Sequence, residues 1–190
     1  MATVATGAPP EHHAVLNCCK DLEGEGEFGH MSLDPDGPPC ACGRRGCLES
    51  LASGTALERE AVRLASGDDG SLLHALSTSD PGSVTGEMVS EAAERGDGAA
   101  LGGFENVGHY LGLGIINLVH IFDPEMVVLG GGVARSGHLL LDRVREVVAE
   151  HGIPSLVSDV TIVLSALGGD AGVVGAAALA WEGKSSQPAK

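Results

Sequence analysis

The stretch from Glu25 to Leu51 constrains this chain most, because it holds three cysteines and one histidine at the spacing of metal ligands. These four residues are His30, Cys40, Cys42 and Cys47. Turn-forming residues after the histidine, and glycines before the last cysteine, allow the chain to double back and bring the four side chains together. Three thiolates and one imidazole complete a tetrahedral zinc site with no position for a catalytic water. The pattern predicts a structural zinc site, with a disulfide or a loop of free thiols as the alternatives.

Composition narrows the class of protein. The chain has 190 residues and a formal net charge of −15, and no basic stripe is visible, which argues against direct binding to nucleic acid. Its length suits one domain with a real core. Hydrophobic residues make up 43% of the chain but aromatic residues only 3%, so the core must be built from Ala, Val, Leu and Ile.

The sequence also indicates in which cellular compartment the protein is found. The longest apolar run, 111–122, is interrupted by Asn117 and His120 and is too short to span a bilayer. The sequence does not open with a charged segment followed by an apolar run, so we expect no secretory signal. We therefore expect a cytoplasmic protein with no membrane partner and with reduced thiols. Cys18 and Cys19 fall outside the metal pattern and receive no role.

Apolar periodicity predicts helices in the middle of the chain. They are expected over 48–65 with an interruption at Gly54, from Thr85 as N-cap to Glu94, and over 101–122, with Asp97 as a further N-cap. The last of these helices carries two apolar faces and should be mostly buried, and Asp123-Pro124 should end it. Gly108 and Gly112 within it would let another backbone approach closely.

The remainder reads as strand, helix, strand, helix. Short apolar runs at 126–129 and 160–164 predict two buried strands, which should be parallel because the segment between them has crossover length. Ser136 is the expected N-cap of the helix between them, which should run to Glu150. A last helix is expected over 171–181, and an N-cap role explains Asp170 before it.

Three glycines, Gly130, Gly131 and Gly132, directly follow the first expected strand. Open α/β sheets bind nucleotides at the carboxyl ends of their strands, so a nucleotide contact is one interpretation. A tight turn is the other interpretation. The segment is not a Walker A loop, because GGGVARSG lacks the Gly-Lys-Ser/Thr ending.

Four motifs stand out along the chain, namely GEFGH at 26–30, CACGRRGC at 40–47 with the Leu-Glu pair that follows, FDPEMVVLGGGVA and GGDAGVVGAA. They resemble the motifs of the ROK family, which contains ATP-dependent sugar kinases, mostly glucokinases, and sugar-responsive transcriptional repressors. The resemblance extends from about Gly24 to Trp181. It implies an α/β fold, namely the C-terminal part of an actin-like/ribonuclease-H-like sugar kinase with a zinc-binding loop, over 24–182. Residues 1–23 are left unassigned, with disorder as one interpretation, and 183–190 read as a disordered tail.

The resemblance also implies ligands. Glu27, His30 and Glu49 match residues that contact the hexose in the family, and the three glycines become candidate contacts for ATP. Carboxylates accept hydrogen bonds from sugar hydroxyls, and zinc on one ring nitrogen of His30 would leave the other nitrogen as a donor. Without the resemblance, the two glutamates read as solvated surface charges. Zinc is expected as a structural ion, and ATP and magnesium are expected for the complete family protein.

The departures from the family matter as much. Its kinases carry an Asp- and Gly-rich phosphate loop and an aspartate that acts as general base, and neither motif is found here, so no catalytic residue is assigned. We expect a glucokinase-type hexose kinase, with glucose as the hexose, represented by an incomplete chain that is inactive alone unless Asp34 or Asp36 substitutes as the base. The alternatives are the sugar-sensing domain of a ROK repressor, although a helix-turn-helix is also missing, and a non-catalytic zinc-stabilised interaction module. A homodimer is left open.

Overall fold

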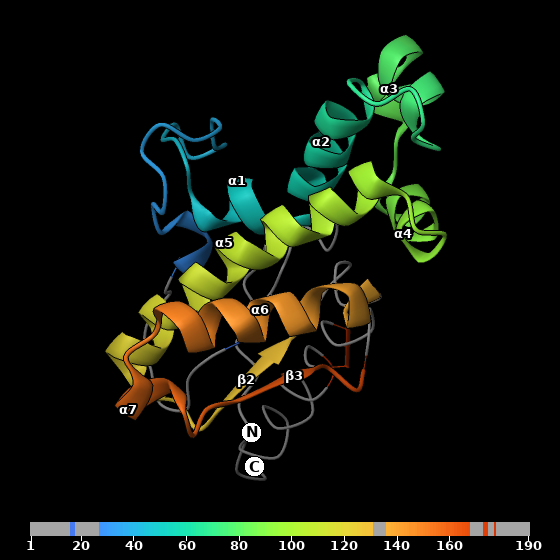
Figure 1. The fold of residues 1–190 in the computed structure, drawn as a ribbon. Coiled ribbons are helices and arrows are strands. Elements are labelled where there is room, and N and C mark those ends of the chain that lie inside the picture. The colour runs from blue at the N-terminus through green and yellow to red at the C-terminus, as the bar shows by residue number, and fades with distance from the viewer. Residues whose placement is uncertain (1–15, 18–26, 131–135, 168–172, 175–176, 178–190) are drawn as a thin grey trace, which may run out of the picture.

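The computed structural model describes residues 16–17, 27–130, 136–167, 173–174 and 177. Its elements are β1 (Leu16–Asn17), the 3-10 turn η2 (Phe28–His30), α1 (Leu48–Ala52), α2 (Gly54–Ala65), α3 (His74–Ser79), the 3-10 turn η3 (Pro81–Ser83), α4 (Gly86–Glu94), α5 (Gly98–Phe122), β2 (Met126–Leu129), α6 (His138–His151), α7 (Pro154–Val157) and β3 (Thr161–Leu164). In Figure 1 the long helix α5 crosses the middle of the molecule. Helices α1 and α2 lie on one side of it, and α6 with the small sheet lies on the other.

The predicted long helix is confirmed, and it begins earlier than its apolar pattern indicated. The side chain of Asp97 accepts a hydrogen bond from the backbone N–H of Ala100, which caps α5 and adds a turn before Leu101. The helix ends where Asp123 adopts a left-handed conformation (φ 47°), directly before a proline. Much of α5 is buried, as its two apolar faces predicted.

Glycines in α5 allow the close helix packing that the sequence predicted. A Cβ at Gly112 would lie 2.7 Å from the Cβ of Val147 on α6, and one at Gly108 would lie 2.9 Å from Cγ of Arg143. Real Cβ atoms do not come this close to their neighbours. The helices α5 and α6 can therefore pack at this distance only because these positions carry no side chain.

The expected helix over 48–65 is two helices, because the backbone at Ser53 is extended and ends α1. The hydroxyl of Ser53 then accepts from the N–H of Ala56 and caps α2, so the break falls one residue before the glycine that was expected to cause it. Thr85 caps α4 as predicted, through Met88 N–H. The turn-rich segment that follows α2 contains a short helix that the sequence did not indicate, α3.

The sheet has the order β1-β2-β3. The predicted parallel pairing is confirmed, with Met126 opposite Thr161 and Leu129 opposite Leu164. Strand β1 pairs with β2 in antiparallel orientation, Leu16 opposite Leu129. It lies in the segment left unassigned from the sequence, since two residues are too few to show a period.

One predicted cap is wrong. Ser136 does not cap α6, which starts two residues later after Gly137 and has no side-chain cap. The Ser136 hydroxyl instead donates to Oγ of Ser90 on α4 at 2.6 Å, so it links two helices. The helix expected over 171–181 falls mostly outside the described residues, as does Asp170. No helix in the described ranges combines the length and apolar character needed to cross a membrane.

Candidate functional site

The residues 33–47, here called the cysteine loop, are held in shape by backbone hydrogen bonds. The carbonyl of Gly46 accepts from the N–H groups of Leu33 (2.8 Å) and Asp34 (3.2 Å), and the N–H of Gly46 donates to Pro38. The N–H of Cys40 donates to the carbonyl of Arg44 at 2.8 Å. Gly46 itself has φ +59°, a conformation that glycine adopts without steric cost. The turn-forming residues therefore fold the loop back on itself, as their composition predicted.

The cysteine loop is tied to the segment that carries the histidine. His30 ends η2, and Arg44 donates from Nη2 to the His30 carbonyl at 2.6 Å. The N–H of Leu48 donates to the carbonyl of Met31 at 2.8 Å, just beyond the histidine. These contacts hold His30 against the cysteine loop, although it precedes the first loop cysteine by ten residues.

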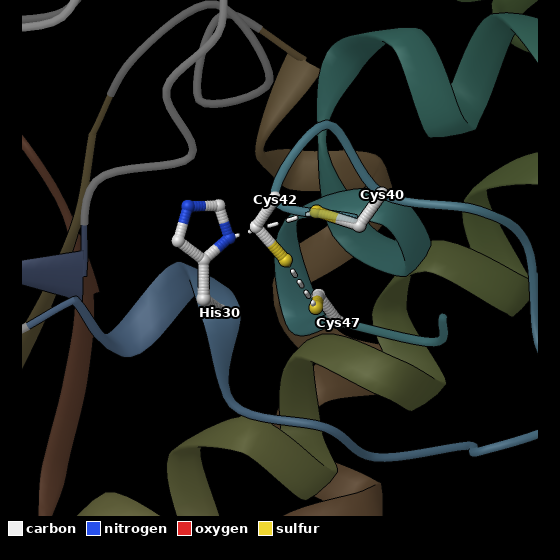
Figure 2. Close-up of side chains that lie close together, drawn as sticks. All are labelled: His30, Cys40, Cys42 and Cys47. Atoms are coloured by element: carbon white, nitrogen blue, oxygen red, sulfur yellow. Dashed lines mark hydrogen bonds between the residues drawn. The ribbon is translucent and has the colours of Figure 1, made fainter. Parts of the chain in front are cut away.

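The four predicted metal ligands come together in one cluster. The donor atoms of His30, Cys40, Cys42 and Cys47 all lie within 4.8 Å of one another. Figure 2 shows the imidazole facing the sulfur atoms. Nδ1 of the histidine lies 3.6 Å from Sγ of Cys40, and the other two sulfurs also lie 3.6 Å apart.

Two of these separations fit a tetrahedral zinc ion as they stand, and the other donor atoms, all within 4.8 Å of one another, would have to draw closer around a bound ion. Zinc binds sulfur at about 2.3 Å and histidine nitrogen at about 2.0–2.1 Å, which places neighbouring ligands about 3.5–3.8 Å apart in a tetrahedron. Both 3.6 Å contacts agree with that spacing. The chemistry of the donor set, three sulfurs and one imidazole, is also that of a closed structural site. Binding of zinc by this cluster stays a prediction.

The environment of the thiols differs strongly along the loop. The backbone N–H and the guanidinium of Arg44 lower the pKa of the exposed Cys42 thiol to about 6. Burial, together with the neighbouring Cys42, raises the pKa of Cys47 to about 12. Without a metal, Arg44 therefore favours the thiolate of Cys42, whereas burial favours the protonated thiol of Cys47. A metal ion would have to displace that proton to bind.

Arg44 is the site residue that the sequence did not single out. It stands inside CACGRRGC, and its guanidinium contacts the loop thiol Cys42 and the carbonyl of His30. Two adjacent arginines between cysteines in a chain of net charge −15 are the signal that could have revealed it.

Of the three predicted sugar contacts, the structure brings two together. Oε2 of Glu49 lies 3.5 Å from Nδ1 of His30, and both side chains are about one-third exposed or less. Glu49 is in the first turn of α1, directly after the loop, where the helix dipole favours a carboxylate. Glu27 is exposed ahead of η2, and no contact described for its side chain joins it to the other two. Since Nδ1 faces the cluster, Nε2 is the nitrogen left to meet a ligand.

Of the three glycines predicted to contact a nucleotide, only the first lies within the described residues. Gly130 follows β2, and beside it the N–H of Ser165, after β3, donates to the carbonyl of Leu129 at 2.7 Å. The carboxyl ends of the two parallel strands thus lie together. Gly131 and Gly132 lie outside the described residues, so the nucleotide contact stays a prediction.

The family of the chain follows from comparison with known proteins. Residues 18–182 match the ROK family, and the chain belongs to this family. The glucokinase of Thermotoga maritima is 39% identical over 153 residues, which cover 80% of this chain and 48% of that enzyme. The xylose repressor of Bacillus spizizenii is 31% identical over 157 residues, covering 83% of this chain and 37% of the repressor. This chain thus spans about half the length of the glucokinase and less of the repressor.

The fold is shared with solved structures of the family. A ROK family glucokinase from Streptomyces griseus, solved with glucose and AMPPNP, has a TM-score of 0.73 and 38% identity, covering 82% of this chain and 51% of that one. The predicted α/β fold of the actin-like sugar-kinase type is therefore confirmed.

Proposed function

We propose that this chain supplies the hexose-binding part of a glucokinase-type ROK sugar kinase, which transfers phosphate from ATP to glucose. The observation that carries the proposal is the 3.5 Å approach of Glu49 Oε2 to His30 Nδ1 beside the cysteine cluster. It places a hydrogen-bond acceptor and an imidazole side by side, both partly exposed. Relatives that are glucokinases support the choice of substrate.

The chemistry at the site would be recognition of neighbouring hydroxyl groups. Ionised Glu49 accepts hydrogen bonds from a sugar hydroxyl, and Nε2 of His30 donates to one. A zinc ion on the four clustered ligands would fix the tautomer and direction of the imidazole. The cysteine loop would then serve binding indirectly, by orienting a histidine. Glu27 is exposed and lies close to His30 in the sequence. It would be a third contact, and its side chain would have to move toward the bound sugar.

ATP would bind at the carboxyl edge of β2 and β3, where Gly130 begins the glycine run. Magnesium would accompany its phosphates. The Streptomyces griseus relative was solved with both glucose and AMPPNP, which supports a shared arrangement of the two ligands. The prediction that these 190 residues alone show no useful turnover follows from the motifs not found in them, and a coupled ATP-consumption assay with glucose tests it.

A second function is favoured by the repressors among the relatives, one at 31% identity over 157 residues. In that case the same Glu49 and His30 would sense a sugar without phosphorylating it. Binding of xylose in place of glucose, unaffected by a nucleotide, would support this second function.

Calorimetry with glucose tests the proposal. The variant Glu49→Gln should bind glucose about 10- to 150-fold more weakly, because a hydrogen bond to a charged group contributes about 1.5–3 kcal/mol. Glu91→Gln on α4, an exposed glutamate outside the site, is the control with the same chemical change and should bind as the parent does. Unchanged glucose affinity in Glu49→Gln, with an unchanged thermal midpoint, would show that this carboxylate does not contact the sugar.

A further inference from the structure

The three thiols of the cysteine loop differ in exposure. Cys42 is exposed, Cys40 is half-buried, and Cys47 is fully buried with 0% of its surface exposed. Cys42 stands in the turn that the N–H of Gly43 closes onto the carbonyl of Cys40 at 3.0 Å. A small solute arriving from water therefore meets Cys42 first.

The exposed thiol has the buried one as its neighbour. Sγ of Cys42 lies 3.6 Å from Sγ of Cys47, whereas Cys40 faces Nδ1 of His30 at the same distance (Figure 2). A disulfide bond is about 2.05 Å long, so an approach of about 1.5 Å would join the pair. A bridge from Cys42 to Cys40 would instead span a single intervening residue and close a small, strained ring.

The backbone of Cys47, which carries the buried thiol, is held in place by hydrogen bonds. The carbonyl of Cys47 accepts from the N–H of Leu51 (3.1 Å) and from the hydroxyl of Ser50 (2.8 Å), which anchors the residue at the start of α1. Cys42 lies in the exposed turn on the other side. The turn can supply the movement while α1 stays in place.

We propose that Cys42 is a site of oxidative modification by hydrogen peroxide, and that Cys47 resolves it as an intramolecular disulfide that abolishes metal binding. In the first step the sulfur of Cys42 attacks peroxide, the O–O bond breaks, and a sulfenic acid and one water form. In the second step the Cys47 sulfur attacks that sulfur, the S–O bond breaks, and a second water leaves. Two sulfurs lose two electrons in total, and one peroxide is reduced to two waters.

The effect of this disulfide on metal binding rests on the proposed zinc site. A disulfide removes two of the four ligands, and His30 with Cys40 cannot complete a tetrahedral site by themselves. One zinc should therefore leave for each disulfide formed. Because Glu49 follows Cys47 by two residues, and His30 loses the ion that orients it, sugar binding should weaken with the metal loss.

The test uses the zinc-loaded full chain carrying Cys18→Ala and Cys19→Ala, so that only the loop thiols react. One equivalent of peroxide is added while a chromophoric chelator reports released zinc, and the protein is then alkylated and digested with trypsin. Cleavage after Arg44 and Arg45 separates Cys47 from the other two thiols, so mass spectrometry identifies a bridge as linked peptides. We expect a Cys42–Cys47 bridge, an alkylated Cys40 and one zinc released per bridge.

Two variants keep the proposal falsifiable. Cys40→Ser should still form the bridge, whereas Cys47→Ser should stop at a sulfenic acid on Cys42, which a dimedone probe traps. A bridge that involves Cys40 in the parent, or full retention of zinc after the Cys42–Cys47 bridge forms, would overturn the proposal. If the purified chain carries no zinc, the metal assignment fails on that measurement, and bridge mapping in the same sample still decides the thiol pairing.

Discussion

Gly46 crosses the backbone of Asp34 so closely that a Cβ at position 46 would overlap the Asp34 carbonyl oxygen. The two residues are joined by a hydrogen bond from the N–H of Asp34 to the carbonyl of Gly46 at 3.2 Å. This crossing closes the cysteine loop one residue before its last thiol. The shape of the predicted metal site therefore depends on a position that carries no metal ligand.

Gly46→Ala should open the cysteine loop and abolish metal binding, because the new methyl group has no room and the left-handed conformation disfavours alanine. Gly43→Ala is the matched control, since Gly43 also has positive φ (+86°) but a Cβ added there would meet no atom within 4 Å. The control should lose only about 1–3 kcal/mol through backbone strain and keep its metal. Elemental analysis and thermal unfolding measure both variants. Full zinc content in Gly46→Ala would contradict the role given to this crossing.

Asp97 should be the most costly helix cap to remove. Its carboxylate accepts from the N–H groups of Ala100 (2.9 Å) and Leu72 (2.6 Å) and from the hydroxyl of Ser71, so it joins α5 to the segment before α3. Asp97→Ala should destabilise the chain by at least about 2 kcal/mol, combining a lost cap with unsatisfied buried donors. Thr85→Ala at the cap of α4, whose bond is 3.4 Å long, is the comparison and should cost about 1 kcal/mol or less. Urea unfolding gives both values, and equal losses would refute this ranking.

The same carboxylate predicts a dependence of stability on pH. Burial would raise the pKa of Asp97, but the backbone N–H groups of Ala100 and Leu72 and the Ser71 hydroxyl outweigh burial and hold the pKa below its usual value. A group with a lowered folded pKa stabilises the fold fully above its unfolded pKa, about 3.9 for aspartate, and this contribution is lost as the pH falls through the folded value. Asp97→Asn should therefore flatten the loss of stability below about pH 4. An unchanged acid profile in that variant would contradict the assignment.

Metal affinity should fall as the solution is acidified. The pKa of Cys47 is about 12, so a metal ion must displace one proton from this thiol at neutral pH. That exchange alone weakens binding about tenfold for each unit of pH lowered. Cys42, with a pKa of about 6, adds to the slope only at lower pH. Competition with a chromophoric chelator at about pH 8 and pH 7 measures the slope, and equal affinities at the two would contradict it.

Local chemistry made much of the fold predictable. Ligand spacing singled out the cluster of His30 and the three loop cysteines, and the glycines of α5 marked where α6 packs. The caps at Thr85 and Asp97 were found because an oxygen side chain stands before each apolar period. Ser136 has the same appearance, yet its hydroxyl is drawn to Ser90 on another helix, and such a tertiary contact leaves no local pattern.

Other features had no local signal strong enough to find them. Strand β1 consists of two residues whose partners in β2 lie far along the chain. The role of Arg44 depends on where its guanidinium reaches after the loop has folded, namely Cys42 and the His30 carbonyl. The proximity of Glu49 to His30 was implied by family resemblance, whereas its cause, the turn from the cysteine loop into α1, became visible only in three dimensions.

If a metal in the cysteine cluster orients His30 toward a sugar beside Glu49, removal of the metal should weaken sugar binding. Calorimetric titration of glucose into the zinc-loaded chain, and into the same chain after zinc is removed by a chelator, measures this effect. We predict measurable glucose binding with zinc and at least a tenfold weaker affinity without it, restored when zinc is returned; a tenfold change corresponds to about 1.4 kcal/mol. Equal glucose affinity in the two samples, with the metal content verified in each, would contradict this effect of the metal.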